Sequence, residues 1–186
     1  MEINIETFST KRLQLKKITP EVYHHFYTNC SDDEIKLFFA LTTNEELEKE
    51  KQRFLEGVYA NFRQIVWFQI LLKETNEIIG YCGFHIWNKK HHRAEIGYYI
   101  IDDKNKQKGY MTEAVAFVIN YGFNTMQLNR IEAFVAPEGF ASLKILSKFG
   151  FEKEGYCKGH YYINDIAEDS VFFALLNKNY QLKFKD

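Results

Sequence analysis

The sequence predicts one α/β domain in which helices flank a mixed sheet. Strand-like segments alternate with amphipathic helices along most of the 186 residues, and 46% of the residues are hydrophobic, enough for a substantial core. Only Pro20 and Pro137 interrupt the chain, and no repeat, low-complexity tract or Pro/Gly linker divides it. We therefore expect a single domain spanning residues 1–186.

The first third is predicted to be mainly helical after one strand. Arg12–Lys16 alternates apolar and polar residues, as a half-buried strand does. Pro20 favours a helix start, and a helix is expected over Glu21–Thr28. Asn44 is predicted to cap the next helix. The apolar side chains of that helix recur with helical spacing at Leu47, Phe54, Leu55, Val58, Tyr59 and Phe62.

Three strands and two turns are predicted next. Ile65–Lys73 and Ile78–Trp87 are rich in β-forming residues and are separated by a short Thr-Asn-Glu turn, so they indicate a hairpin. Ala94–Ile101 is the third strand, and the basic stretch Asn88–Arg93 before it is interpreted as a solvated turn. Asp102–Gly109 then forms a polar loop without an apolar residue.

The last third is predicted to contain two helices and three strands. An amphipathic helix follows the polar loop, and Arg130–Ala136 is a strand that Pro137 ends. A second helix ends at Gly150, which occupies the expected C′ position. Two strands, about 151–162 and 169–176, complete a β-α-α-β-β-β-α-β-α-β-β order.

Charge and cysteine content exclude several classes of function. The net charge is −1 and the basic residues are scattered, so no nucleic-acid partner is expected. No apolar run is long enough to span a bilayer, and the first residues do not resemble a signal peptide. The three cysteines are far apart and predict neither a disulfide framework nor a metal site. These features favour a cytoplasmic protein.

The loop before the first of these helices carries the clearest chemical signal. A strand–loop–helix turn directs backbone N–H groups and the positive end of a helix dipole toward one point, where a pyrophosphate can bind. Gly109 lets the backbone approach closely, and Lys106 and Lys108 add positive charge. The alternative is a flexible glycine before an ordinary helix. Neither a Walker loop nor a dinucleotide fingerprint is present.

This loop resembles the acyl-coenzyme-A loop of the GNAT acetyltransferases, written Q/R-x-x-G-x-G/A. Gly109 matches it, whereas Lys106 replaces Gln or Arg and Met111 replaces Gly or Ala. Further segments resemble the RimJ/RimL-like branch of ribosomal-protein N-terminal acetyltransferases. They follow one another in the branch's order: Thr10–Leu15, Ala94–Tyr98, Gly109–Ala114, Arg130–Ala133, Lys148–Phe151 and Glu154-Gly155.

The resemblance implies a GNAT fold with acetyl-CoA as co-substrate and no metal. The sheet would splay between Ala94–Ile101 and Arg130–Ala136, near Tyr99 to Ile101, where exposed backbone would bind the pantetheine arm. Gly139 stands where the branch usually has an Asn that contacts the cofactor, so that contact would be missing. The cofactor-binding residues expected from the resemblance are Tyr99, Ile100, Ile101, Lys106, Gln107, Lys108, Gly109, Tyr110, Met111, Thr112, Gly139 and Ser142.

Three residues are candidates for catalysis. Glu95 is the best general base, acting through a water, because a carboxylate near an apolar cleft has a raised pKa. The alternative is an ion pair with Arg93 or Arg130. Ser142 is expected to contact the cofactor or protonate the thiolate, or else to satisfy a backbone group of its helix. Tyr161 would line the amine site or donate a proton, or simply pack in the sheet.

Other side chains are interpreted as structural. His85 and His160 are potential bases, but single strand histidines are more often hydrogen-bonded. Asp169 is expected to hold the loop after Asn164-Asp165. Trp67, Trp87 and Phe38-Phe39 would line an acceptor cleft or belong to the core.

We therefore expect an acetyl-CoA-dependent N-acetyltransferase in which a primary amine attacks directly within a ternary complex. The acceptor would be a protein or peptide N-terminus. The alternatives are a small amine, such as a polyamine, amino sugar or amino-acid-like metabolite, and an acyl-CoA-binding protein without turnover. The aromatic content is also compatible with a homodimer.

Overall fold

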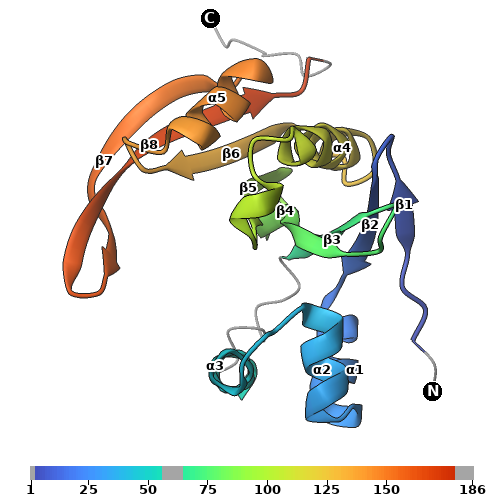
Figure 1. Ribbon diagram of the computed structural model, residues 1–186. Coiled ribbons are helices and arrows are strands. Elements are labelled where there is room, and N and C mark those ends of the chain that lie inside the picture. Colours follow the sequence, from blue (N-terminus) through green and yellow to red (C-terminus); the bar gives the residue numbers. More distant parts are fainter. Residues whose placement is uncertain (1–2, 56–64, 179–186) are drawn as a thin grey trace, which may run out of the picture.

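The computed structural model describes residues 3–55 and 65–178, which contain one eight-stranded sheet of order β1-β2-β3-β4-β5-β6-β8-β7 (Figure 1). Neighbouring strands are antiparallel except β5 and β6, which are parallel, so the predicted mixed sheet is confirmed. The strands are β1 Thr7–Ser9, β2 Leu13–Ile18, β3 Val66–Leu72, β4 Ile78–Asn88, β5 Arg93–Ile100, β6 Arg130–Val135, β7 Glu152–Ile163 and β8 Ile166–Leu176. The helices are α1 Pro20–Asn29, α2 Asp32–Phe39, α3 Asn44–Leu55, α4 Tyr110–Asn124, α5 Phe140–Lys148 and the short 3₁₀ helix η2 Asp103–Asn105.

Apart from the short η2 inside the predicted polar loop, two elements escaped the sequence analysis. Strand β1 has three residues, too few to show an alternating pattern. Helix α2 begins with a capping box in which Ser31 Oγ accepts from Glu34 N–H, and the Glu34 carboxylate accepts from Ser31 N–H at 2.7 Å. That Ser-x-x-Glu signature was readable from the chain.

The predicted cap of α3 is wrong by one residue. Thr43 Oγ1 accepts from the Glu46 backbone N–H at 3.1 Å, and the Glu46 carboxylate accepts from Thr43 N–H at 3.2 Å. Asn44 is instead the first helical residue. The predicted continuation of this helix through Val58, Tyr59 and Phe62 lies outside the described residues.

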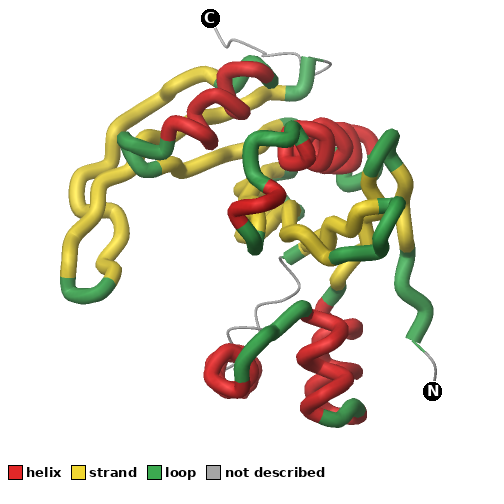
Figure 2. The backbone as a smooth tube through the Cα atoms, in the orientation of Figure 1, coloured by secondary structure: helices red, strands yellow, loops and turns green. Residues whose placement is uncertain are grey.

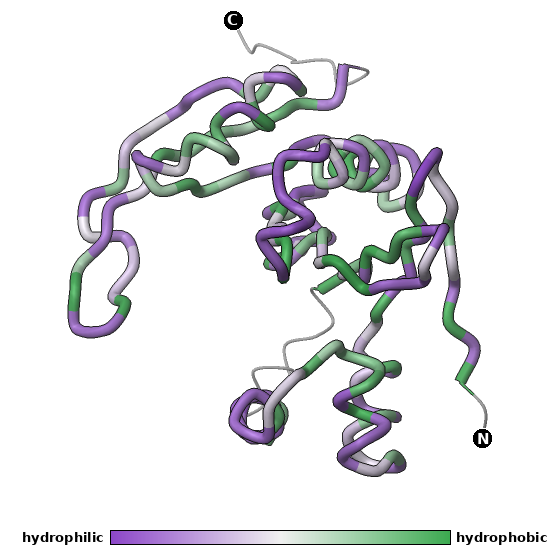
Figure 3. Tube along the Cα trace, in the orientation of Figure 1, coloured by the Kyte–Doolittle hydropathy of each residue, from purple (hydrophilic) through white to green (hydrophobic). Residues whose placement is uncertain are grey.

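The helices cover the two faces of the sheet unequally. Helix α4 packs on one face, where Ala114 and Val118 meet the buried Phe68, Phe84 and Ile96. Helices α1 to α3 lie on the opposite side (Figure 1) and enclose a second apolar cluster. That cluster is made of Ile18, Val22, Ile35, Phe39 and Leu47. Apolar residues accordingly concentrate along the inner strands and helix faces (Figure 3).

Strands β7 and β8 form a long hairpin that projects beyond the rest of the sheet (Figure 2). Asp169 is structural, as expected, but it contacts β7 rather than the loop after Asn164. Its carboxylate accepts from Gly159 N–H and from Tyr156 Oη, each at 2.7 Å. Gly150, with φ of 76°, follows α5 in the left-handed conformation predicted for a C′ glycine.

Candidate functional site

The parallel strands β5 and β6 separate after a short paired region. Their register runs from Arg93 opposite Arg130 to Glu95 opposite Glu132 and then stops, although β5 continues to Ile100 and β6 to Val135. The sheet is therefore splayed where the sequence predicted, but the separation begins at Glu95 rather than near Tyr99. Among the described residues, no strand pairs with the edge of β5 that faces β6 beyond Glu95.

The register with β4 determines which peptide groups face this gap. Ile101 N–H donates to Ile79 C=O at 3.0 Å, and antiparallel residues alternate between facing the partner strand and facing away from it. Tyr99 and Ile101 therefore direct their peptide groups toward β4. Tyr98 and Ile100 direct theirs into the gap. Of the three residues expected to bind the pantetheine arm, only Ile100 is so oriented, and Tyr98 was missed.

The start of α4 provides the second part of the site. Gly109 is the N-cap residue, its φ is 77°, and no side chain caps this end of the helix. The first N–H to bond within the helix is that of Glu113, which donates to Gly109 C=O at 3.1 Å. The N–H groups of Tyr110, Met111 and Thr112 precede it and are free of a side-chain cap. This is the arrangement that binds an anion at a helix N-terminus.

Thr10 and Arg12, in the turn between β1 and β2, form a staple that fixes this helix start. The Glu113 carboxylate accepts from the Arg12 backbone N–H, from Arg12 Nε and from Thr10 Oγ1, each at 2.7 Å. Arg12 Nη1 also donates to Lys108 C=O at 2.9 Å, and its guanidinium lies 4.6 Å from the centre of the Tyr110 ring. Burial raises the pKa of Glu113, but these donors outweigh it and leave the pKa below its ordinary value.

The loop before α4 is anchored and not loose. Asn105 is buried, and its Nδ2 donates to Glu77 Oε1 in the β3–β4 turn at 3.1 Å. Lys106 forms an ion pair with Asp103. Gln107 is in the left-handed region with φ of 59°. Lys108 is exposed, and within residues 3–55 and 65–178 no carboxylate pairs with it.

Glu95 lies at the point where the gap opens. It is 8% exposed, and burial together with the neighbouring charge of Glu132 raises its pKa to about 7. The alternative that pairs Glu95 with Arg93 or Arg130 is wrong, because both arginines bind Glu132 instead. Glu95 is thus a buried carboxylate that titrates near neutral pH.

Aromatic and imidazole side chains surround Glu95 on its face of the sheet. His85 Nε2 lies 3.4 Å from Glu95 Oε1, and its ring stacks on Trp67 with centroids 6.1 Å apart. Burial first, and the charge of Glu95 second, raise the pKa of Tyr161, so this tyrosine is an electrostatic neighbour of the carboxylate. His160 already has a hydrogen-bond partner, because its Nδ1 lies 2.6 Å from Ser170 Oγ.

Ser142 lies on the opposite side of the sheet from Glu95. It is half-buried in the first turn of α5 and faces Tyr98, the side chain of which points to the α4 side by strand alternation. The Tyr98 hydroxyl is buried, and its pKa is raised to about 12 by burial despite the nearby Ser142 hydroxyl. Among the described residues, neither the Tyr98 hydroxyl nor the Ser142 hydroxyl forms a hydrogen bond with the backbone. Glu95 and Ser142 therefore flank the gap from its two faces.

Gly139 is enclosed by its own turn. A Cβ at this position would lie 2.8 Å from Val135 Cγ1 and 3.0 Å from Ala136 C=O. Gly139 N–H donates to the same carbonyl at 2.8 Å. The turn thus packs closely around the position where a side chain at residue 139 would begin.

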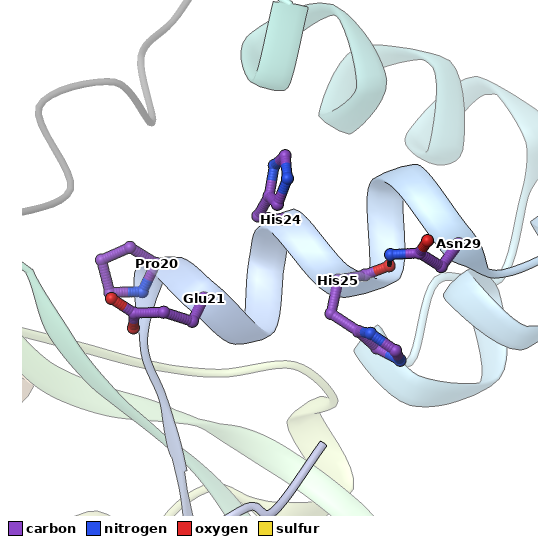
Figure 4. Close-up of a pocket in the computed structure, with 5 residues that line it drawn as sticks. All are labelled: Pro20, Glu21, His24, His25 and Asn29. Atoms are coloured by element: carbon purple, nitrogen blue, oxygen red, sulfur yellow. Dashed lines mark hydrogen bonds between the residues drawn. The ribbon is translucent and has the colours of Figure 1, made fainter. Parts of the chain in front are cut away.

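One depression lies outside this candidate site. A depression on α1 is lined by Pro20, Glu21, His24, His25 and Asn29, none of which belongs to β5, α4 or α5 (Figure 4). The part of the chain that the structure describes has no group of three or more side chains arranged to hold a metal ion. None of its helices is long and apolar enough to cross a membrane.

The chain is similar to acetyltransferases over most of its length. The acetyltransferase (GNAT) domain family matches residues 12–152. The uncharacterized N-acetyltransferase p20 of Bacillus licheniformis is 34% identical over 183 residues, which cover 95% of this chain and 99% of that protein. The ribosomal protein uS5-alanine N-acetyltransferase of Escherichia coli (strain K12) is 34% identical over 110 residues, 59% of this chain and 56% of that protein. The crystal structure of a ribosomal-protein-S5-alanine acetyltransferase from Vibrio fischeri superposes with a TM-score of 0.69 at 25% identity, covering 95% of this chain and 99% of that one.

Proposed function

This chain belongs to the GNAT acetyltransferase family and is an N-acetyltransferase, and we propose that its acceptor is the free N-terminus of a protein or peptide. The observation that carries the proposal is the gap between β5 and β6, which leads to the uncapped start of α4. The names of the uS5-alanine acetyltransferases from Escherichia coli and Vibrio fischeri support this acceptor class. One catalytic domain would span the whole chain.

GNAT enzymes take their acetyl group from acetyl-CoA. In the proposed complex, the N–H groups at the start of α4 hold the diphosphate, with Lys108 adding positive charge. The pantetheine arm lies along the free edge of β5 and pairs with Tyr98 and Ile100. Exposed peptide groups suit this arm because its own amides need donors and acceptors. The thioester then lies between Glu95 and Ser142.

The reaction proceeds by direct attack. The neutral amine adds to the thioester carbonyl, a nitrogen–carbon bond forms, and the carbon–sulfur bond breaks. Glu95 accepts the proton that the amine nitrogen loses, through a water molecule. Ser142, on the other face, gives its hydroxyl proton to the departing thiolate and takes a proton back from water, with the Tyr98 hydroxyl beside it. Tyr161 lines the amine side, where the charge of Glu95 reaches it.

A small amine is the second candidate acceptor, because Glu95 and Glu132 place two carboxylates side by side. A polyamine would use both as counter-charges. The arginines beside Glu132 weaken this alternative, since they already neutralise that carboxylate. Of these two carboxylates, only that of Glu95 then remains without an arginine partner. This suits an acceptor with a single amine, such as the α-amino group of a peptide.

An acceptor panel tests the proposal. The purified chain is incubated with acetyl-CoA and one amine at a time, and the released thiol is measured. We expect turnover with a short peptide that has a free N-terminal alanine, and none with the same peptide already N-acetylated. Spermidine is the small-amine probe. Faster turnover with spermidine than with the free peptide would contradict the proposal.

A pair of serine variants tests the acid. Ser142→Ala is expected to lower kcat, whereas Ser147→Ala, at an exposed position late in the same helix, is expected to leave it unchanged. Equal rates in the two variants would remove Ser142 from the mechanism.

A further inference from the structure

His85 and Glu95 form a close pair at the last point where β5 and β6 are joined. The two residues are directly opposite in the register of β4 and β5, and His85 Nε2 lies 3.4 Å from Glu95 Oε1. The His85 side chain is 32% exposed, whereas that of Glu95 is 10% exposed. The imidazole therefore connects a buried carboxylate with solvent.

The backbone of β4 is irregular immediately after His85. The register shifts so that Ile86 and Trp87 lie opposite the single residue Ala94, as in a β-bulge. Ile86 has φ of 51°, a conformation that a β-branched side chain rarely adopts. Bulges of this kind redirect a neighbouring side chain. The strand thus departs from regular geometry at the residue that contacts Glu95.

Side-chain packing holds the imidazole from two more directions. Its ring stacks on Trp67 with an interplanar angle of 10°. A Cβ at Gly97 would lie 3.0 Å from Trp67 Cη2 and 3.2 Å from His85 Nε2, so the absence of a side chain there makes room for both rings. His85 therefore occupies a defined place beside the carboxylate.

The surrounding charges leave Glu95 without a cationic partner. Glu132 is bound by Arg93 and Arg130, and burial lowers the pKa of His85, so the imidazole beside Glu95 is neutral at neutral pH. Further titratable and charged groups on this face are Tyr81 of β4, Arg93 and Tyr99 of β5, Arg130 and Glu132 of β6, and Glu154, His160 and Tyr161 of β7.

We infer that His85 is a positioning residue that holds Glu95 and relays its proton to solvent after each turnover. The inference rests on the role of Glu95 in the proposed function. The amine N–H bond breaks and an O–H bond forms on Glu95. The carboxylic acid then gives that proton to His85 Nε2, and the imidazolium releases a proton to water. Glu95 returns to its ionised form and His85 to its neutral form.

The pair itself is tested without any acceptor. Nuclear magnetic resonance follows the His85 Cε1–H signal of the full chain as the pH is varied. We expect two steps, one of them near pH 7 from Glu95, because interacting groups titrate as a pair. In Glu95→Gln the step near neutral pH should vanish, while the signal of exposed His91, the control, should be the same in both proteins. Identical one-step curves for His85 would overturn the inference.

The relay is tested by turnover with the alanine peptide. In His85→Ala, kcat should fall roughly 10- to 100-fold with the KM for acetyl-CoA unchanged, and added imidazole should restore it as an external proton acceptor. His85→Gln keeps the bulk of the ring and should lose the same turnover without rescue. His91→Ala is the matched control and should equal the wild type. Normal kcat in His85→Gln, or no imidazole rescue of His85→Ala, would contradict the relay.

The experiments distinguish a wrong acceptor from a wrong relay. If the wild type does not acetylate the peptide, the proposed acceptor is wrong, and the titration of His85 still decides whether the pair exists. If the peptide is acetylated at the same rate by wild type and His85→Gln, the acceptor stands and the relay is wrong.

Discussion

Arg12 and Glu113, 101 positions apart, are joined by two hydrogen bonds that fix the start of α4. The backbone N–H and the Nε of Arg12 each lie 2.7 Å from a Glu113 carboxylate oxygen, and Arg12 Nη1 holds the Lys108 carbonyl. The turn between β1 and β2 thereby sets the conformation of the loop that receives the diphosphate in the proposed complex. Stability and coenzyme affinity should both depend on this contact.

Glu113→Ala should lower the free energy of unfolding by about 1.5–3 kcal/mol, because it removes hydrogen bonds to a charged group that is 16% exposed. It should also weaken acetyl-CoA binding, since the Lys108–Gly109 turn loses its support. Chemical denaturation and calorimetric titration measure the two effects. Glu45→Ala breaks an exposed ion pair with Lys49 and should change neither quantity measurably. Unaltered affinity in Glu113→Ala would separate the staple from coenzyme binding.

Glu95→Gln should reduce kcat by about 100-fold or more while leaving the affinity for acetyl-CoA unchanged, since it removes a general base but no coenzyme contact. In the wild type, kcat/KM should rise with pH and level off above about 7, because Glu95 acts in its ionised form. The variant should lack that rise. A wild-type rate in Glu95→Gln at every pH would exclude Glu95 as the base.

The same carboxylate should impose a pH dependence on stability. The pKa of Glu95 is raised from 4.5 in the unfolded chain to about 7 in the folded one, so the folded state binds the extra proton. Its contribution is fully present below pH 4.5 and is lost as the pH rises through 7. Glu95→Gln should therefore gain up to about 3 kcal/mol over the wild type at pH 8, and little at pH 4.5. Parallel stability curves from denaturation at the two pH values would contradict the raised pKa.

Gly139→Asn should not create the cofactor contact that the family resemblance leads us to expect of an Asn at this position. The new Cβ would lie 2.8 Å from Val135 Cγ1, so the substitution should destabilise the fold by about 1–3 kcal/mol. Adding Val135→Ala should recover part of that loss. Thermal unfolding and acetyl-CoA titration of the single and double variants measure this. A single variant that is as stable as the wild type and binds acetyl-CoA more tightly would show that the turn accommodates Asn.

The sequence predicted the order of the larger elements because each carries a local signal. Alternation marks β2, runs of β-forming residues mark β3 and β4, the C′ glycine ends α5, and the Gly109 loop precedes α4. The features that the sequence did not predict are elements too short to show a pattern and contacts between residues far apart in the chain. Strand β1 is too short to show a period, and the helix-capping role of Thr43 was assigned to its neighbour. The partners of a side chain cannot be predicted locally, so Arg93 and Arg130 were considered as alternative partners of Glu95, whereas both bind Glu132.

The candidate site was predictable in its location but not in its contacts. The loop and the splayed strands follow from the motifs. The choice of Tyr98 and Ile100 as the residues that face the gap follows from a hydrogen-bond register that only the folded sheet defines. His85 was interpreted as structural because nothing in its own strand indicates that it lies opposite Glu95.

The central claim is that acetyl-CoA lies in the gap between β5 and β6 with its diphosphate on the start of α4. Amide hydrogen exchange at saturating acetyl-CoA measures this residue by residue. We predict slower exchange at Tyr98 and Ile100 and at Tyr110, Met111 and Thr112, with the tip of the β7–β8 hairpin unchanged. Unaltered exchange at those amides, or slower exchange confined to the depression on α1, would contradict the claim.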